Sequence, residues 1–204
     1  MTILRILCSP RGSASASHRL SQHLVDQLVR SRGGQGLPVI DIDATRLPHV
    51  DAAYAAALCA PADPPPDACA HGTLRQSDEL IQALRDARYV VIATPMHNYT
   101  VPSALKAWID HVVRVRHTFQ ITPQGKIGTL ADRPVLVAIA SGGEFTGEAA
   151  RQPDFLTPYL KAVLGTIGLH DVRFHSAQGT VRGVRVAAHG HVEGDPAHSP
   201  AQAT

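Results

Sequence analysis

Cysteine, aromatic side chains and charge are all scarce in this chain of 204 residues. Its three cysteines, Cys8, Cys59 and Cys69, are an odd number without CxxC spacing, so we expect reduced thiols and no disulfide framework. Aromatic residues make up only 4% of the chain, and its 19 Lys and Arg are scattered around a formal net charge of +2. A base-stacking surface and a basic stripe are therefore both missing, and nucleic acid is not an expected partner.

Long apolar runs are absent as well. No stretch of about eighteen apolar residues occurs, and Met1 to Cys8 lacks the basic start of a secretory signal, so we expect a cytoplasmic protein that does not enter a membrane. Charged residues contribute 18% of the chain, which is low for a monomer that must cover its whole surface with charge, so part of the surface should be hidden in an oligomer. The apolar content of 44% is enough for the core of one domain.

Short apolar runs rich in β-branched residues alternate with longer stretches of helical periodicity. This order predicts a doubly wound α/β fold, in which helices cover both faces of a five-stranded parallel sheet. The expected strands are Thr2 to Cys8, Pro38 to Ile42, Tyr89 to Ala93, Pro134 to Ile139 and Val172 to His175.

Four stretches show the apolar spacing of a helix that is buried on one face. The first contains Leu20 to Val29, the second begins with Ser77 as its N-terminal cap, and the third runs from Ser103 to Arg116. The fourth covers Leu156 to Ile167, where Gly168 is well placed to end it.

Two regions do not fit this alternation. Four prolines between Ala60 and Gly72 exclude a regular helix or central strand and predict an exposed loop or flap. From Ala188 to Thr204 the chain has no apolar period, so we expect residues 1–187 to form the domain and 188–204 to be a disordered tail. The tail contains the pair His189 and His191 but no third ordered ligand, so no metal site is expected.

Ligands of open parallel sheets bind beyond the carboxyl ends of the strands, where the chain reverses its direction of winding. Three unusually polar or Gly-rich loops follow the expected strands there: Ser9 to Ser17, Thr94 to Tyr99 and Ser141 to Gly147. The first loop carries four serines and leads into a helix, which suits a phosphate. It lacks GxxxxGK[ST] and GxGxxG, so a phosphate monoester such as flavin mononucleotide (FMN) remains. The alternative is that Ser15 or Ser17 only caps the helix.

Three segments together resemble a known family: SPRGSASASHRLSQ, then TPMHNYTVPSALKAWIDHVVRVRHTF, then SGGEFTGE followed by LTPYLKAVLGTIGLHDVRF. They are similar to the FMN-dependent NADH:quinone and azobenzene reductases (azoreductases) of the flavodoxin-like superfamily. The resemblance runs in order from about Ile3 to about Gly179. It implies a flavodoxin-like FMN-binding domain over residues 1–187.

The resemblance also implies a role for each loop. The FMN phosphate would be held by Ser9, Ser15, Ala16 and Ser17. The isoalloxazine ring would be lined by Pro95, Met96, His97, Asn98 and Tyr99. Its pyrimidine edge would face Ser141, Gly142, Gly143 and Glu144. Phe119 would be an aromatic wall for flat acceptors or, alternatively, a core aromatic.

The sequence departs from the family pattern at three places. His97 stands where the family usually has an aromatic residue, and Gly142, Gly143 and Glu144 stand where an arginine and two glycines are usual. The usual final helix is missing, because the stretch after Gly179 has no helical period. We expect these departures to affect the choice of acceptor and the contacts of the third loop more than the binding of flavin.

The function that the resemblance implies is two-electron transfer from NADH or NADPH to quinones and azo compounds. The donor reduces FMN and leaves, and the acceptor then takes its place, which is a ping-pong cycle. FMN carries the chemistry, so no side chain is expected to be catalytic. The resemblance also points to a homodimer. The alternatives are a non-catalytic flavodoxin-like electron carrier or sensing module, although such carriers are usually acidic, and an NADPH-dependent FMN reductase that releases its flavin.

Overall fold

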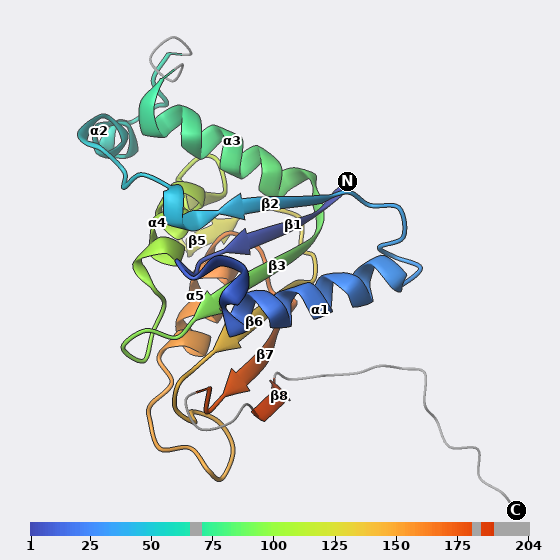
Figure 1. Cartoon of the computed structure of the whole chain (residues 1–204). Coiled ribbons are helices and arrows are strands. Elements are labelled where there is room, and N and C mark those ends of the chain that lie inside the picture. The colour runs from blue at the N-terminus through green and yellow to red at the C-terminus, as the bar shows by residue number, and fades with distance from the viewer. Residues whose placement is uncertain (66–70, 181–184, 190–204) are drawn as a thin grey trace, which may run out of the picture.

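Five parallel strands form the centre of the protein (Figure 1), as the alternation of strands and helices predicts. The computed structural model describes residues 1–65, 71–180 and, for the backbone alone, 185–189. The sheet has the order β2-β1-β3-β6-β7-β8. Its strands are β1 (Thr2–Leu7), β2 (Val39–Asp43), β3 (Ala87–Pro95), β6 (Val135–Ala140), β7 (Val172–Gln178) and β8 (Arg185–His189).

The chain starts near the middle of this sheet. From β1 it first adds β2 on one side and then crosses to β3 on the other, and all three strands are parallel. The direction of winding therefore reverses between β1 and β3, which is where a flavodoxin-like sheet binds its ligand. The expected flavodoxin-like order of five parallel strands is confirmed.

A sixth strand, β8, was not predicted. It pairs antiparallel with β7 at the edge of the sheet, in the stretch where the usual final helix is missing. Gly179 has a positive φ of 65° and stands at the end of β7, which allows the chain to change direction there. The strand includes Ala188 and His189, which the sequence pattern had placed in the tail; residues 190–204 lie outside the described part of the chain.

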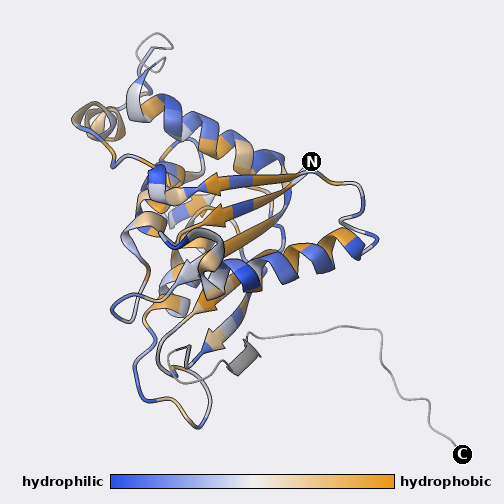
Figure 2. Ribbon diagram, viewed as in Figure 1, coloured by the Kyte–Doolittle hydropathy of each residue, from blue (hydrophilic) through white to orange (hydrophobic). Residues whose placement is uncertain are grey.

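Helices cover both faces of the sheet, and alternate residues of the strands point to each face. On one face, Ile3 and Val91 pack with Leu24 and Val25 of helix α1 (Ala16–Arg30). The other face packs against α3 (Gly72–Asp86), α4 (Ser103–Val112) and α5 (Leu156–Thr166). Figure 2 shows the resulting pattern of apolar strands inside helices with polar outer faces. Within the described residues, none of the helices combines the length and apolar character that a bilayer crossing requires.

Short elements complete the fold. The 3-10 turns η1 (Gly12–Ala14) and η2 (Ala44–Arg46) follow β1 and β2, and α2 (Ala52–Cys59) precedes the proline-rich loop. Outside the main sheet, β4 (Phe119–Thr122) and β5 (Gly125–Gly128) form an antiparallel hairpin. None of these elements was predicted. Of the expected loop, Ala60 to Pro65 has no regular structure and 66–70 lies outside the described residues.

Two expected helix ends were wrong. Helix α3 begins five residues before Ser77, which is buried inside the helix and donates its hydroxyl to the carbonyl of His111 at 2.6 Å instead of capping. Helix α4 ends at Val112, four residues before Arg116. Val113, with a φ of −87° and a ψ of 78°, leaves the helical conformation, and Arg116, with a φ of 69°, then turns the chain towards the hairpin. The end of α5 is confirmed, since Gly168 has a φ of 100°.

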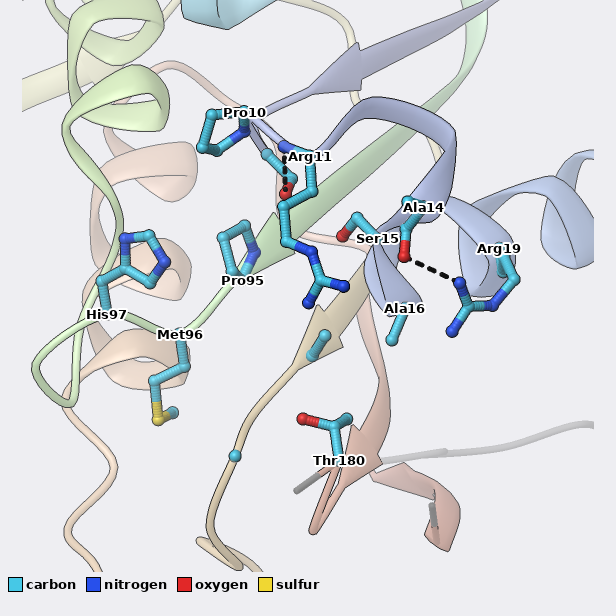
Figure 3. A pocket seen from close by; sticks show the side chains of 13 residues that line it. Pro10, Arg11, Ala14, Ser15, Ala16, Arg19, Pro95, Met96, His97 and Thr180 are labelled. Carbon is cyan, nitrogen blue, oxygen red and sulfur yellow. Dashed lines mark hydrogen bonds between the residues drawn. The ribbon is translucent and has the colours of Figure 1, made fainter. Parts of the chain in front are cut away.

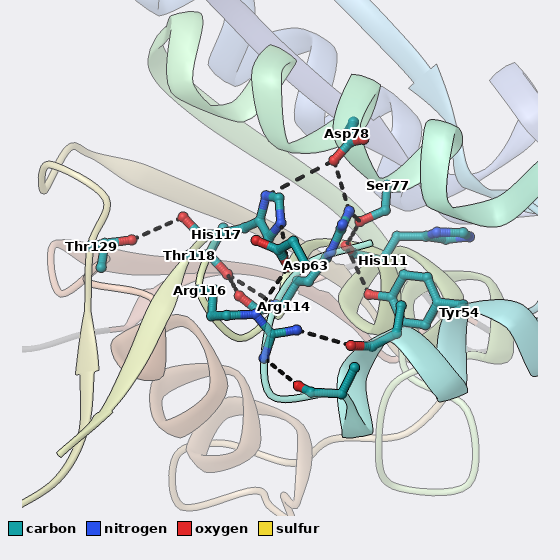
Figure 4. Close-up of polar contacts among 12 residues, drawn as sticks. Tyr54, Asp63, Ser77, Asp78, His111, Arg114, Arg116, His117, Thr118 and Thr129 are labelled. Carbon is teal, nitrogen blue, oxygen red and sulfur yellow. Dashed lines mark hydrogen bonds and ion pairs between the residues drawn. The ribbon is translucent and has the colours of Figure 1, made fainter. Parts of the chain in front are cut away.

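A polar network explains how the chain around α2 is attached to the end of α4 (Figure 4). The guanidinium of Arg114 is only 2% exposed and donates to Asp78 at 2.7 Å and to Ser77 at 3.3 Å. Arg116 donates to Asp63 at 3.0 Å and to two carbonyls at and just beyond the end of α2. Because the buried Arg114 cation has oxygen partners, its burial does not leave an uncompensated charge.

Candidate functional site

A cavity of about 380 Å³ opens at the carboxyl ends of β1, β3 and β6, beside the point where the winding reverses. Figure 3 shows the side chains that surround it. All three loops that the sequence analysis indicated contribute to the lining. Thr180, two residues after the end of β7, also lines the cavity. The structure therefore brings together loops that are far apart in the chain.

The first loop supplies Ser9, Ser15 and Ala16 to the cavity. Ser15 occupies the N-terminal cap position of α1, but its hydroxyl makes no capping hydrogen bond and instead pairs with the hydroxyl of Ser17 at 2.8 Å. The capping alternative is thus wrong for both serines. The amides of the first turn of α1 keep their capacity to bind an anion, and the positive end of the helix dipole favours one.

Ser17 is placed differently from the other serines of this loop. Its side chain is fully buried and faces Leu7, Cys8 and Gly12 in a small internal space, not the main cavity. It reaches the cavity only through its hydrogen bond with Ser15. Ser17 is therefore suited to orient the Ser15 hydroxyl, and not to contact a ligand itself.

Two arginines line the same end of the cavity and were not among the expected site residues. Arg19 donates to the carbonyl of Ala14 at 2.8 Å, which ties it to the loop. Arg11 extends over the cavity between Pro95 and Ser15 in Figure 3. Positive charge beside unpaired amides suits a phosphate dianion. The signal in the sequence was the presence of two arginines within and just after the serine-rich loop.

The second loop contributes Pro95, Met96 and His97 to the cavity. The backbone of His97 pairs with that of Thr100 through two hydrogen bonds of 2.9 and 3.0 Å, which closes a tight turn. Asn98 and Tyr99 at its tip have positive φ values of 50° and 68°, a conformation that asparagine tolerates and that is unusual for tyrosine. Neither of these two residues lines the cavity, whereas Pro95 and Met96 offer it an apolar floor.

The third loop reaches the cavity through Gly142 and the adjoining Ala140. Ser141 is buried and accepts a hydrogen bond of 2.9 Å from the side chain of Gln152. A Cβ at Gly143 would lie 2.4 Å from the side-chain Oε1 of Gln152, so a larger residue there would require the Gln152 side chain to move. Ser141, Gly143 and Glu144 support the loop and do not line the cavity.

Two glutamines that no sequence pattern indicated hold this third loop. Gln152 also contacts the sulfur of Met96 at 3.2 Å, and so links the second and third loops. Gln178, at the end of β7, accepts from the amides of Phe145 and Thr146 at 2.8 and 3.1 Å. Neither glutamine belongs to a sequence motif, and only the folded chain brings them to the loops.

Phe119, the expected wall for flat acceptors, is only 7% exposed and does not line the cavity. It lies at the start of the hairpin, where the Lys126 ammonium is 5.1 Å from its ring centre. Within this chain its position matches the alternative of a core aromatic.

The cavity has two chemically different ends. One end has serine hydroxyls, the first amides of a helix and two guanidinium groups, all of which suit a phosphate. The other end has Pro95, Met96 and the backbone of Gly142, which suit the face and edge of a flat ring. An elongated ligand with a phosphate at one end and a planar ring at the other, such as FMN, fits these residues.

The sheet order and the site together define a flavodoxin-like α/β protein with a site for a phosphorylated ring. A family model described as a flavodoxin-like fold matches residues 1–193. The chain is 46% identical over 181 residues to an FMN-dependent NADH:quinone oxidoreductase of Pseudomonas fluorescens, an alignment that covers 89% of this chain and 85% of the relative. It is 44% identical over 191 residues to another from Cupriavidus pinatubonensis, covering 92% and 91%. The chain belongs to this flavodoxin-like family of FMN-dependent NADH:quinone oxidoreductases.

Solved structures agree with this assignment. An FMN-dependent NADH-azoreductase from Bacillus anthracis, crystallised in complex with FMN, superposes with a TM-score of 0.71 at 26% identity and covers 88% of each chain. The azoreductase AzrA shares the fold, with a TM-score of 0.73 at 21% identity over 88% of this chain.

Proposed function

We propose that this protein is an FMN-dependent oxidoreductase that passes two electrons from NADH, or NADPH, to quinones. The net reaction is NADH + H⁺ + quinone → NAD⁺ + hydroquinone, and cleavage of an azo bond to two amines would consume two such electron pairs. The observation that carries the proposal is the cavity at the winding reversal, which has a phosphate end and a ring end. The names of the relatives support the donor and the acceptor.

The residues of this chain would bind and orient the cofactor. FMN supplies the ring that accepts and donates hydride when bound. Ser9, Ser15 and the first amides of α1 would hold the phosphate, with Arg11 and Arg19 balancing its charge. Met96 and His97 would lie along the ring, and the backbone at Gly142 could donate to its electron-rich edge. A ping-pong order, in which NAD⁺ leaves before the quinone binds, is part of the proposal.

Assembly and location complete the proposal. Large apolar side chains are exposed next to the site, since Tyr99 is 47% and Phe155 60% exposed and the amide of Phe155 donates to the carbonyl of Tyr99. Ile121 and Ile127 of the hairpin are exposed by 71% and 52%. Such surfaces support a homodimer. NADH and NADPH are nucleotides of the cytoplasm, which supports a cytoplasmic location.

The experiment that tests the function uses the purified protein with FMN. We expect yellow protein whose flavin absorption remains through gel filtration, and steady consumption of NADH when a quinone such as menadione is added. Flavin that separates from the protein on the column would favour a reductase that releases FMN. Bound flavin without sustained NADH consumption would favour an electron carrier or a sensing module.

A further inference from the structure

The side-chain amide of Gln152 lies between the second and third loops. Gln152 belongs to the segment between the third loop and α5, and its side chain is half-buried. Its Nε2 donates to the Ser141 hydroxyl at 2.9 Å and to the Met96 sulfur at 3.2 Å. A Cβ at Gly143 would come within 2.4 Å of its Oε1, so the amide also packs closely against the backbone of that glycine. One side chain therefore contacts both loops.

These contacts are made to the parts of the two loops that form the cavity. Met96 lines the cavity directly, and Ser141 stands between two lining residues, Ala140 and Gly142. Gln152 itself is outside the lining. An effect of Gln152 on a ligand must therefore act through the residues that it holds in place.

The third loop has two other anchors, one on each side of its glycines. The backbone of Ser141 is fixed to β7 and to the residues after it by hydrogen bonds of 2.9 and 3.1 Å, and the side chain of Gln178 holds the loop further along. Between these anchors, Gly142 and Gly143 have no side chains that could fix their backbone, and glycine is free to adopt many conformations. The side chain of Gln152 packs against this short piece of backbone and restrains it.

We propose that Gln152 is a positioning residue that sets the reduction potential of the bound flavin, an inference that rests on the proposed FMN site. The proposed function places the backbone of Gly142 at the electron-rich edge of the ring. An amide donor that is held there stabilises the negative charge that reduction brings more than it stabilises the neutral oxidised ring. The restraint by Gln152 keeps this donor in one orientation, and so favours the reduced flavin.

The first variant removes the restraint. In Gln152→Ala the loop keeps its other anchors, so the protein should fold. We expect reduced FMN to bind about tenfold more weakly, as when a hydrogen bond to a charged group is lost, with little change in the Kd of oxidised FMN. A tenfold change in the ratio of these two constants lowers the two-electron midpoint potential by about 30 mV. The potential is measured on the FMN-loaded protein by equilibration with a reference dye.

The second variant displaces the same side chain without removing it. Alanine at Gly143 would clash with Gln152, and the φ of Gly143 is not positive, so the substitution brings no backbone strain of its own. We expect Gly143→Ala to lower the midpoint potential as well. In the double variant the clashing side chain is gone, so its potential should equal that of Gln152→Ala alone. Gln82→Ala, which removes an exposed glutamine amide on α3, is the control and should leave the potential unchanged.

The outcomes separate this inference from the proposed function. Unchanged potentials in both single variants overturn the inference, and so does an equal loss of affinity for oxidised and reduced FMN, which would show that Gln152 only maintains the fold. Additive shifts in the double variant also overturn it, because the two substitutions would then act independently. If Gln152→Ala does not fold, the potential of Gly143→Ala decides. Wild-type protein that binds no FMN would overturn the proposed function together with this inference.

Discussion

At the scale of single residues, the structure changes which side chains of the first loop are expected to touch the phosphate. Ser17 belongs to the serine motif but is buried behind Ser15, whereas Arg11 and Arg19 belong to no motif and line the cavity. A motif records residue types at given spacings. Whether a hydroxyl points into the cavity or beneath it depends on the turn η1, which the spacing does not specify.

The residue that best distinguishes a phosphate site from a general polar loop is Arg11. We expect Arg11→Gln to weaken FMN binding by about 1.5–3 kcal/mol, because a hydrogen bond between charged groups is lost. Binding of riboflavin, which has no phosphate, should hardly change. Fluorescence titration with both flavins at low and high salt measures this, and Arg75→Gln, at an exposed site on α3, is the control. An equal loss of affinity for both flavins would show that Arg11 acts on the ring or on folding.

At the scale of elements, attachment of the chain around α2 depends on the groups at the end of α4 (Figure 4). His117 lies 3.4 Å from Asp63 and 3.9 Å from Asp78. Burial lowers the pKa of His117, and the positive charge of Arg114 lowers it further, while the two aspartates oppose this. The folded protein therefore binds this proton less readily than the unfolded chain does.

This pKa direction sets the sign of a pH effect on stability. The unfolded histidine titrates near pH ~6.5, so above that pH both states are neutral and the full stability is present. As the pH falls through this value the unfolded state takes up more protons, and the free energy of unfolding should decrease. We expect a smaller decrease between pH 7.5 and 5.5 in His117→Gln, as measured by urea denaturation. A residual effect should remain because burial also lowers the pKa of His18; identical profiles for the two proteins would exclude a role for His117.

At the scale of the whole molecule, we propose that the exposed apolar side chains of the hairpin form the interface of a homodimer. Ile121 is 71% exposed, and we expect Ile121→Asp to shift a homodimer towards monomer, because a carboxylate would be buried at the interface. Gln120→Asp introduces the same charge one residue away, on the opposite face of the hairpin, and should leave the dimer intact. Sedimentation velocity at micromolar concentration distinguishes these results. Wild-type protein that sediments as a monomer with full activity would show that the hairpin has another role.

The sequence by itself determined the five parallel strands, the helices α1, α3, α4 and α5, and the loops that carry the chemistry. The β-branched runs that end at Cys8 and Ala93 must be buried, and so must the apolar stripe from Leu105 to Val112. A parallel sheet between helices is the arrangement that buries all three. The strand order then brings the loops after Leu7, Pro95 and Ala140 to one edge. For the same reason the local patterns are enough to locate the candidate site at this edge.

Tertiary structure alone decided which residues face the cavity, where β8 lies and where the chain turns after α4. Gln152 and Gln178 carry no local signal, because their partners, a hydroxyl and a backbone amide, belong to other segments of the chain. The strand β8 and the turn at Arg116 depend on pairing with neighbours rather than on periodicity. A second cavity of about 270 Å³ has the same origin, since its walls come from the ends of β1 and β2 and the start of α4. Short-range patterns fix the elements, whereas contacts between distant segments fix the shape of the space that they enclose.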